Sequence, residues 1–317
     1  MKIVFFGTPE YCLPILNKIQ KKFKIKLHDM PIVAVITQNP KPVGRKEFIT
    51  YSAVDTWAYK RKIPVFYSVD DFLKQKIDAD LGIVVAYGEI LSKEIINYFP
   101  FGILNIHPSL LPKYRGASPL QATIASGDLV SGATIMKIDE KMDHGPIVTQ
   151  FKEEVKSDDN SKILGDRIFE KAAEVLVGLL PAYIKDKITL KKQGHEDATY
   201  TTLLKKENGY IPGKYLNAAI DGKTLKENWE INFIKDLSLR VTPENIERFI
   251  RAISPWPGAW TLIFIDSIKK EPKRLKIIEA VLSENTLKIK SVKLEGKLEV
   301  SWKEFKKGYP NFSFSLK

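Results

Sequence analysis

Cysteine is nearly absent from this 317-residue chain, which contains Cys12 and no other. A single cysteine excludes an internal disulfide framework and a cysteine-based metal cluster. The four histidines do not form a group with the spacing of zinc ligands. We therefore expect no metal site, and we expect Cys12 to be a small buried apolar residue rather than a reactive thiol.

Long apolar runs are missing as well. No segment approaches the ~20 apolar residues of a membrane-spanning helix. The first residues hold one lysine and a very short apolar run before Gly7, which is unlike a secretory signal peptide. We find no internal repeat and no low-complexity tract. The sequence therefore predicts a soluble, cytoplasmic, globular protein.

Glycine-rich phosphate-binding motifs are also lacking. The first expected strand, Lys2–Phe6, is followed by Gly7-Thr8-Pro9 and not by G-x-G-x-x-G. The lysine pattern of a P-loop does not occur either. A dinucleotide or ATP site therefore has little support.

Positive charge is abundant and unevenly distributed. The chain holds 50 Lys and Arg against 38 Asp and Glu, a net charge of +12. Residues 188–317 contribute 24 basic and 16 acidic side chains, a surplus of 8, whereas residues 1–187 contribute 26 and 22, a surplus of 4. A basic excess favours a polyanionic partner such as nucleic acid, although lysine-rich composition also serves solubility alone.

The first part of the chain has the pattern of an α/β domain. Short, continuous apolar segments alternate with amphipathic ones, which indicates a parallel sheet buried on both faces. We expect strands at Lys2–Phe6, Pro31–Thr37, KIPVF within Lys60–Tyr67, Leu81–Ala86 and Gly102–Ile106, and a pair of strands at Ala133–Ile138 and Pro146–Phe151. We expect helices after Pro9, at Ser52–Arg61 and at Ser161–Leu180.

The second part has a different character. Lys185–Leu204 is polar and has the composition of a linker. Thr242–Ile253 has a helical period, with Thr242 at the cap position and Pro243 in the first turn. From Ala259 onward, short apolar strands alternate with charged turns, the pattern of a small antiparallel barrel. We place the domains at residues 1–187 and 207–317, with a linker at 188–206.

The loop Asn105–Gly116 reads NIHPSLLPKYRG and directly follows an expected strand. Asn105 and His107 flank Ile106, so in a strand their side chains share one face. Ends of parallel strands are where α/β proteins place their sites. Histidine suits proton transfer near neutral pH, and an asparagine amide can stabilise a developing oxyanion. A single histidine beside a proline is more often structural.

A carboxylate in a later turn adds to this pair. Asp143-His144-Gly145-Pro146 lies between two expected strands, and Asp143 could orient the imidazole of His107. Asp and Gly are also common in ordinary turns. We assign no role to His28, His144 or His195.

Two segments resemble sequences of the folate-dependent formyltransferase family. They are NIHPSLLPKYRGASPLQATIASGD and SGATIMKIDEKMDHGPIVTQ. Their Asn-x-His pair and later Asp-x-Gly are that family's signature. Four further segments are similar to members that formylate methionyl-tRNA. They are MKIVFFGTPEYCLPIL, ITQNPKPVGRK, VVAYGEIL and IERFIRAISPWPGAW. The resemblance implies a Rossmann-like catalytic domain joined to an OB-like β-barrel, and a monomer.

The resemblance also implies an activity. The formyl group of 10-formyltetrahydrofolate would pass to the α-amino group of methionyl initiator tRNA, in translation initiation, without a metal. Asn105, His107 and Asp143 would be the catalytic residues. The folate pocket would be lined by Ser109, Leu110, Leu111 and Pro112, with Ala86, Tyr87 and Gly88. Contacts to the acceptor would come from Arg45 and Lys46 in the basic loop Lys41–Lys46, from the barrel, and from Lys113 and Arg115, which could instead fix their own loop.

The acceptor is the open part of this interpretation. Related enzymes formylate amino sugars on nucleotide carriers and can share both domains. A non-catalytic folate- or RNA-binding protein on the same scaffold is a further alternative. The basic loop is shorter than is usual in the family, and about thirty residues before Val241 have no clear counterpart. The basic surplus of residues 188–317 favours tRNA.

Overall fold

The computed structural model describes residues 1–24, 30–43, 47–265 and 271–315. These divide into two compact units. Unit 1 comprises residues 1–115, 131–153 and 165–198, and unit 2 comprises residues 116–130, 154–164 and 199–317. The units are interleaved in sequence, whereas our predicted domains, 1–187 and 207–317, are contiguous. None of the helices formed by the described residues combines the length and apolarity needed to cross a bilayer.

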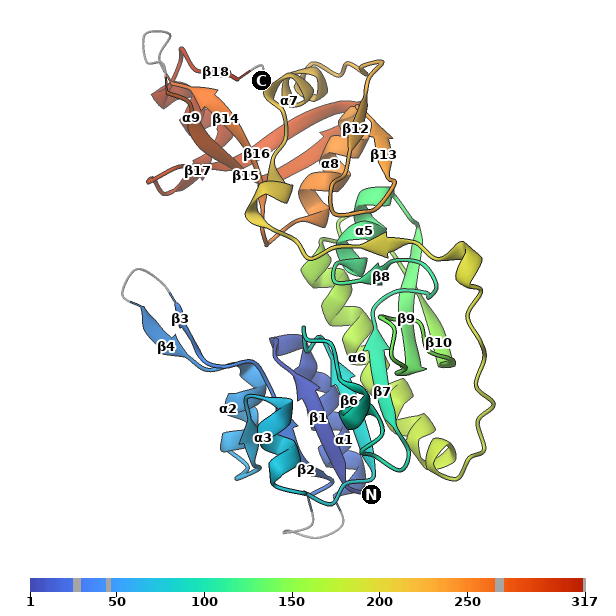
Figure 1. Cartoon of the computed structure of the whole chain (residues 1–317). Helices are drawn as coiled ribbons and strands as arrows, with labels where there is room; N and C mark the ends of the chain where they lie inside the picture. Colours follow the sequence, from blue (N-terminus) through green and yellow to red (C-terminus); the bar gives the residue numbers. More distant parts are fainter. Residues whose placement is uncertain (25–29, 44–46, 266–270, 316–317) are drawn as a thin grey trace. The chain divides into compact units, whose positions relative to one another are not determined.

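A seven-stranded sheet forms the centre of unit 1, in the order β10-β9-β7-β6-β1-β2-β5 (Figure 1). The strands are β1 (Ile3–Gly7), β2 (Ile32–Ile36), β5 (Val65–Phe66), β6 (Leu81–Val85), β7 (Ile103–His107), β9 (Val130–Lys137) and β10 (Ile147–Glu154). Every residue of β1 and β6 is buried, as expected for strands covered on both faces. The predicted strands are therefore present in a Rossmann-like arrangement.

The sheet is mixed rather than wholly parallel. The strands β5, β2, β1, β6 and β7 pair in parallel, but β9 pairs with β7 in antiparallel orientation. The expectation of a parallel sheet is thus wrong at this end. Antiparallel strands at the edge of an otherwise parallel sheet are common. Here the end of β9 lies beside the beginning of β7, with Lys137 opposite Leu104.

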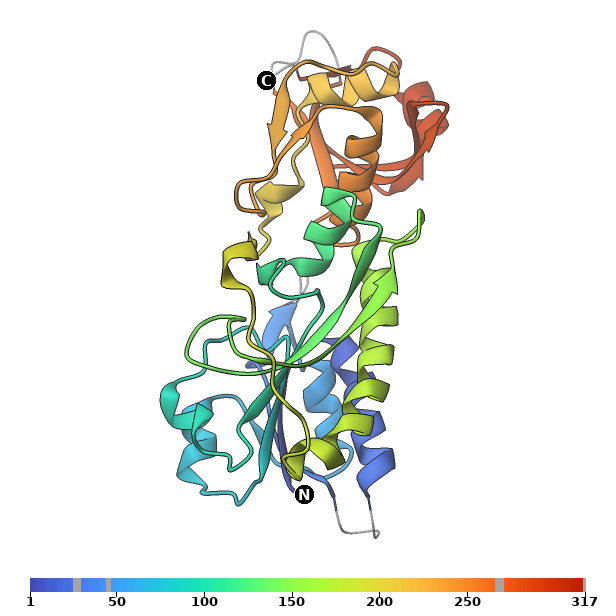
Figure 2. The same cartoon turned by 90° about the vertical axis from the view of Figure 1, so that its right-hand side faces the viewer.

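Helices cover both faces of this sheet. They are α1 (Leu13–Phe23, preceded by the 3-10 turn Glu10–Cys12), α2 (Ala53–Tyr59), α3 (Val69–Lys74), α4 (Lys93–Ile96) and α6 (Ser161–Ile184). Phe72 of α3 and Ile95 of α4 pack with Val4 and Phe6 of β1. The α1 region and α6 lie side by side (Figure 2), and Lys18 Nζ is 3.0 Å from a carboxylate oxygen of Glu174. A short hairpin, β3 (Lys41–Val43) and β4 (Phe48–Thr50), follows β2.

Unit 2 contains an antiparallel sheet with the order β17-β16-β15-β14-β18. Its strands are β14 (Ala259–Phe264), β15 (Lys273–Ser283), β16 (Thr286–Leu294), β17 (Glu299–Ser301) and β18 (Ser313–Phe314). Across the described residues this sheet is open, so the expected barrel is not confirmed. The end strands are only three and two residues long, too short to pair extensively with one another.

The remaining elements of unit 2 include several that the sequence did not predict. They are α5 (Pro119–Ser126), β11 (Tyr200–Thr201), α7 (Gly213–Ile220), β12 (Asn228–Glu230), β13 (Ser238–Arg240), α8 (Pro243–Ala252) and α9 (Trp302–Gly308), with a 3-10 turn at Lys206–Gly209. The short strand β8 (Arg115–Gly116) begins at the last residue of the first segment of unit 1, and unit 1 also contains a 3-10 turn at His195–Asp197. One of the short apolar strands expected after Ala259 is KLEVSW, residues 297–302. The observed strand ends at Ser301, because Ser301 and Glu304 form a capping box that starts α9. The helix at α8 is confirmed, with Thr242 Oγ1 accepting from the Asn245 amide.

Candidate functional site

Asn105 is the middle residue of β7 and His107 is its last residue. They pair with Met136 and Thr134 of β9, and Asn105 also lies opposite Val84 of β6. The alternation of a strand puts both side chains on the same face, as the sequence predicted. His107 is buried, with 4% of its surface exposed, and Asn105 is half-buried.

Asp143 comes to both of these residues from the turn after β9. Its Oδ1 accepts a hydrogen bond from Asn105 Nδ2 at 3.2 Å and lies 3.6 Å from His107 Nδ1. The Asp143 backbone is left-handed, with φ of 49°, a conformation that aspartate tolerates better than most residues. A Cβ on the neighbouring Gly145 would lie 2.0 Å from the carbonyl oxygen of Lys137, so only glycine fits this turn.

The other ring nitrogen of His107 has a backbone partner. Nε2 lies 2.9 Å from the carbonyl oxygen of Tyr114. A carbonyl oxygen only accepts, so Nε2 carries a hydrogen and the neutral ring has its lone pair on Nδ1. Nδ1 is also the nitrogen that faces Asp143. The ring can therefore hold a proton beside a carboxylate without changing its orientation.

The segment Ser109–Pro112 is held by side chains from β9 and β10. Thr134 Oγ1 donates to the Ser109 carbonyl (2.7 Å) and accepts from the Leu111 amide (3.0 Å). Gln150 Nε2 donates to the Leu111 carbonyl and to Thr134 Oγ1, both at 2.8 Å. The Leu111–Pro112 peptide bond is cis. The loop is thus fixed through its backbone, while Leu110 stays half-buried.

The three residues predicted to line the folate pocket at the end of β6 behave differently from one another. Ala86 and Gly88 are exposed and left-handed, with φ of 44° and 87°. Tyr87 is buried in the apolar core, 1% exposed, and burial raises the pKa of its hydroxyl. Its side chain therefore supports the turn, and its carbonyl accepts from Gln38 Nε2 at 3.3 Å.

Of the basic residues predicted to contact the acceptor, the structure describes Lys113 and Arg115, which differ in exposure. Lys113 is exposed. Arg115 is buried, 3% exposed, and its Nη2 lies 2.7 Å from Gln193 Oε1 and 2.8 Å from His195 Nδ1. Of the two roles left open for Arg115, the structure favours fixing the loop. Arg45 and Lys46 lie outside the described residues.

Sequence reasoning missed the polar residues that support this site. Thr134, Gln150 and Gln193 make the hydrogen bonds that hold the loop and the Asp143 turn. Gln193 belongs to the segment that its composition identifies as a linker. One signal was available for Thr134, which belongs to an expected strand, and the structure places it opposite His107.

Metal-ligating groups and the Cys12 thiol were the other features that the sequence raised. No group of three or more His, Cys, Asp or Glu side chains is placed there to hold a metal ion. Burial raises the pKa of the Cys12 thiol, whose Sγ donates to the Val85 carbonyl at 3.3 Å. Cys12 is therefore the buried apolar residue that we expected.

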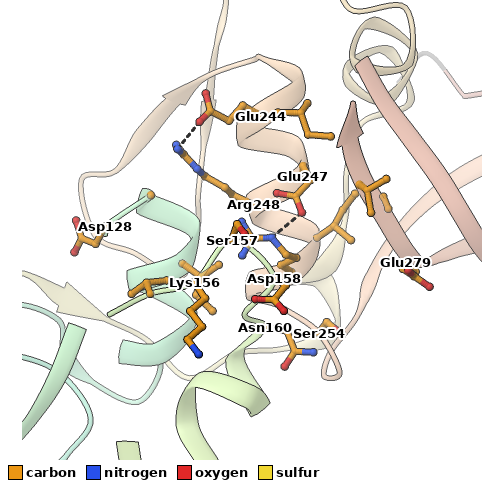
Figure 3. A pocket seen from close by; sticks show the side chains of 18 of the residues that line it. Asp128, Lys156, Ser157, Asp158, Asn160, Glu244, Glu247, Arg248, Ser254 and Glu279 are labelled. Atoms are coloured by element: carbon orange, nitrogen blue, oxygen red, sulfur yellow. Dashed lines mark hydrogen bonds and ion pairs between the residues drawn. The ribbon is translucent and has the colours of Figure 1, made fainter. Parts of the chain in front are cut away.

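A separate pocket of about 600 Å³ lies within unit 2, between α8, β15 and the segments 127–129 and 155–160 (Figure 3). Five acidic and three basic side chains line it. Two of its cations are already paired, Arg248 with Glu244 and Arg251 with Glu247, as the dashed lines in Figure 3 mark. Its acidic excess does not suit phosphate binding, and none of the predicted site residues lines it.

The chain is similar to known proteins over most of its length. Residues 1–180 match the model of the formyl transferase family, and residues 235–286 match that of the formyl transferase C-terminal domain. Methionyl-tRNA formyltransferase from Chloroflexus aggregans is 35% identical over 268 residues, which cover 82% of this chain and 76% of that protein. The enzyme of the same name from Clostridium tetani is 34% identical over 271 residues, with 82% and 76% covered.

Solved structures share the fold at lower identity. Methionyl-tRNA formyltransferase from Clostridium thermocellum has a TM-score of 0.55 and 19% identity, with 93% of this chain and 98% of that chain covered. The N-formyltransferase from Helicobacter canadensis, solved with folinic acid and dTDP-3-aminofucose, has a TM-score of 0.61 and 19% identity, with 89% and 88% covered. The fold therefore accommodates enzymes named for different acceptors.

Proposed function

We propose that this chain, which belongs to the formyl transferase family, transfers the formyl group of 10-formyltetrahydrofolate to the α-amino group of methionyl initiator tRNA. The observation that carries the catalytic part is the position of Asp143 Oδ1, 3.2 Å from Asn105 Nδ2 and 3.6 Å from His107 Nδ1. One carboxylate thereby orients both an amide donor and a proton carrier.

The proposed reaction needs only one proton carrier and one set of donors. The amine nitrogen forms a bond to the formyl carbon, and the carbonyl oxygen becomes an oxyanion. Asn105 donates a hydrogen bond to this oxygen, and His107 donates one from Nδ1 once it has taken up the amine's proton. Removal of a single such donor typically slows a reaction by about 10²–10³. The bond from the formyl carbon to N10 of the folate then breaks.

Proton transfer balances the exchange. The attacking amine loses one proton, and the departing folate nitrogen gains one. His107 Nδ1 is the site in this set that can take up and return a proton, because Nε2 is bonded to the Tyr114 carbonyl. Asp143 stabilises the ring in its charged form. Asn105, His107 and Asp143 are thus the proposed catalytic residues.

The formyl donor is proposed to lie against the loops at the carboxyl ends of β6 and β7. Ser109, Leu110, Leu111 and Pro112 form one wall, and the exposed backbone of Ala86 and Gly88 forms another. Tyr87 contributes through its backbone, since its side chain is buried in the core. The hydrogen bonds of Thr134 and Gln150 support this proposal, because they hold the first wall rigid.

For the acceptor, charge and relatives favour tRNA. The basic surplus of 8 in residues 188–317 provides phosphate-binding groups, and relatives about 35% identical carry the tRNA enzyme's name. We propose that the antiparallel sheet of unit 2 is an open form of an OB-like barrel. Its helix α9 exposes Lys303, Lys306 and Lys307, which we propose as phosphate contacts.

Further acceptor contacts are proposed from Arg45, Lys46 and Lys113, while Arg115 fixes the loop. We propose that the protein acts as a monomer in the cytoplasm. The enzyme class is tested by supplying 10-formyltetrahydrofolate with methionyl initiator tRNA in one assay and with a nucleotide-linked amino sugar in another. Formylated methionyl-tRNA is the expected product. Product from the sugar alone would assign the chain to the other acceptor class.

A further inference from the structure

The side chain of Gln193 connects the turn that contains Asp143 to Arg115, in the loop that follows His107. Its side chain is buried, with 6% of the residue surface exposed. Nε2 donates to the carbonyl oxygens of Asp143 (3.0 Å) and Gly145 (2.8 Å). Oε1 accepts from Nη2 of Arg115 at 2.7 Å. Since carbonyls only accept and arginine only donates, the orientation of this amide is determined by its partners.

The two ends of this bridge converge on His107. On one side, Gln193 holds the backbone of Asp143, whose carboxylate faces Nδ1. On the other side it holds Arg115, the neighbour of Tyr114, whose carbonyl accepts from Nε2. One amide therefore links the backbone of the Asp143 turn to the side chain of Arg115, the residue that follows Tyr114 in the chain.

Gln193 is itself held in place by its own segment. Lys191, two residues earlier, makes two backbone hydrogen bonds with Ile147 of β10, at 2.8 and 2.9 Å. His195, two residues later, accepts from the same Arg115 nitrogen at 2.8 Å and stacks on His144 with ring centroids 4.0 Å apart. The side chain thus has fixed attachments on both sides and little freedom to follow a displaced turn.

We propose that Gln193 is a positioning residue for formyl transfer, which places the Asp143 carboxylate against His107 and Asn105. This inference rests on the proposed catalytic set. Gln193 acts through Asp143 and contacts neither the donor nor the acceptor. Displacing a catalytic group by about 1 Å can lower the rate about a hundredfold, so loss of the bridge should lower kcat and leave KM for the folate nearly unchanged.

Two substitutions distinguish the hydrogen bonds that Gln193 donates to the carbonyl oxygens of Asp143 and Gly145 from the one that it accepts from Arg115. Gln193→Met has a similar length and removes every hydrogen bond. Gln193→Glu keeps an acceptor for Arg115 but directs a carboxylate oxygen at two carbonyl oxygens. The control Tyr183→Phe removes a hydroxyl that donates to the Phe101 carbonyl at 2.9 Å in the same unit, away from the site. Each full-length variant is assayed for formyl transfer from 10-formyltetrahydrofolate to methionyl-tRNA, and its unfolding temperature is measured.

We expect both Gln193 variants to lower kcat about tenfold or more, with KM for 10-formyltetrahydrofolate within about twofold, while Tyr183→Phe keeps kcat. In an Asp143→Ala background, Gln193→Met should have no further effect on kcat. The inference is overturned if Gln193 variants keep kcat while Asp143→Ala loses it, or if Gln193→Met lowers kcat equally in both backgrounds. Wild-type kcat in Asp143→Ala would instead overturn the proposed catalytic set, and this inference with it.

Discussion

The Nε2 atom of His107 lies 2.9 Å from the carbonyl oxygen of Tyr114. This hydrogen bond determines which nitrogen of the ring is available for chemistry. Nδ1 faces Asp143, which also holds the Asn105 amide. A histidine with one nitrogen bonded to backbone and the other beside a carboxylate is oriented for repeated proton transfer. Substitutions can perturb this site and its supporting framework separately.

Removing the hydroxyl of Thr134 should weaken the loop Ser109–Pro112. Thr134→Val deprives a buried amide and a buried carbonyl of their partner, which should lower the free energy of unfolding by about 1–3 kcal/mol and raise KM for the folate. Urea denaturation and initial rates measure both. Thr261→Val is the matched control, because Thr261 is fully buried and its Oγ1 has no hydrogen-bond partner among the described residues. Equal losses in the two variants would contradict the role of Thr134.

Two glycine-to-alanine substitutions in unit 1 should have opposite effects. Gly145→Ala places a Cβ 2.0 Å from the Lys137 carbonyl oxygen, so it should destabilise by about 1–3 kcal/mol and lower activity by displacing Asp143. A Cβ added to Gly178 of α6 would meet no atom of the described residues within 4 Å, apart from its own neighbouring helix backbone. Gly178→Ala should therefore stabilise by about 0.5–1 kcal/mol. Thermal unfolding of both variants checks the contrast, and a stable, fully active Gly145→Ala protein would refute the account of this turn.

His195 should make stability depend on pH below neutrality. Desolvation, followed by nearby His144 and Arg115, lowers the pKa of His195 from its ordinary value of 6.5. The unfolded chain then binds the proton more readily than the folded chain, so the contribution of His195 to stability is full above pH 6.5 and declines as pH falls through the lowered value. His195→Asn keeps an acceptor for Arg115 but does not titrate. Its unfolding temperature should vary less with pH in this window, and an unchanged pH dependence would contradict the prediction.

The lysines of α9 should strengthen tRNA binding electrostatically. Replacing Lys303, Lys306 and Lys307 together by alanine should weaken tRNA binding and reduce the slope of log affinity against log salt by about 2, since each phosphate contact contributes roughly 0.7–0.9. The control replaces three exposed lysines of unit 1, Lys60, Lys62 and Lys76. If both triple variants lose affinity to the same extent, net charge rather than a localised surface is responsible.

Much of unit 1 could be predicted from sequence because both faces of its sheet are buried. Segments such as Ile3–Gly7 and Leu81–Val85 are then continuous apolar runs with clear ends. The two-residue period of a strand predicted that the side chains of Asn105 and His107 lie on the same face. The turn between two strands made Asp143 a candidate partner of His107, and the resemblance to a family gave it a catalytic role, since spacing alone does not bring residues 107 and 143 together.

What escaped prediction depends on side-chain partners that a linear pattern does not reveal. Gln193 lies in a polar segment, where a buried bridging amide looks like a solvated linker residue. Trp302 continues an apparent strand, and only the Ser301–Glu304 cap turns the chain into α9. The closed barrel was expected from alternating short strands, a pattern that an open antiparallel sheet shares.

The central claim is that Asn105 and His107 catalyse formyl transfer to methionyl-tRNA. The most direct test measures transfer from 10-formyltetrahydrofolate to methionyl initiator tRNA by the purified wild-type, Asn105→Ala and His107→Ala proteins. The wild-type protein should formylate methionyl-tRNA. Each variant should lose about 10²-fold or more in kcat/KM while its unfolding temperature stays above the assay temperature. Folded variants that retain near wild-type transfer would contradict the account of this site.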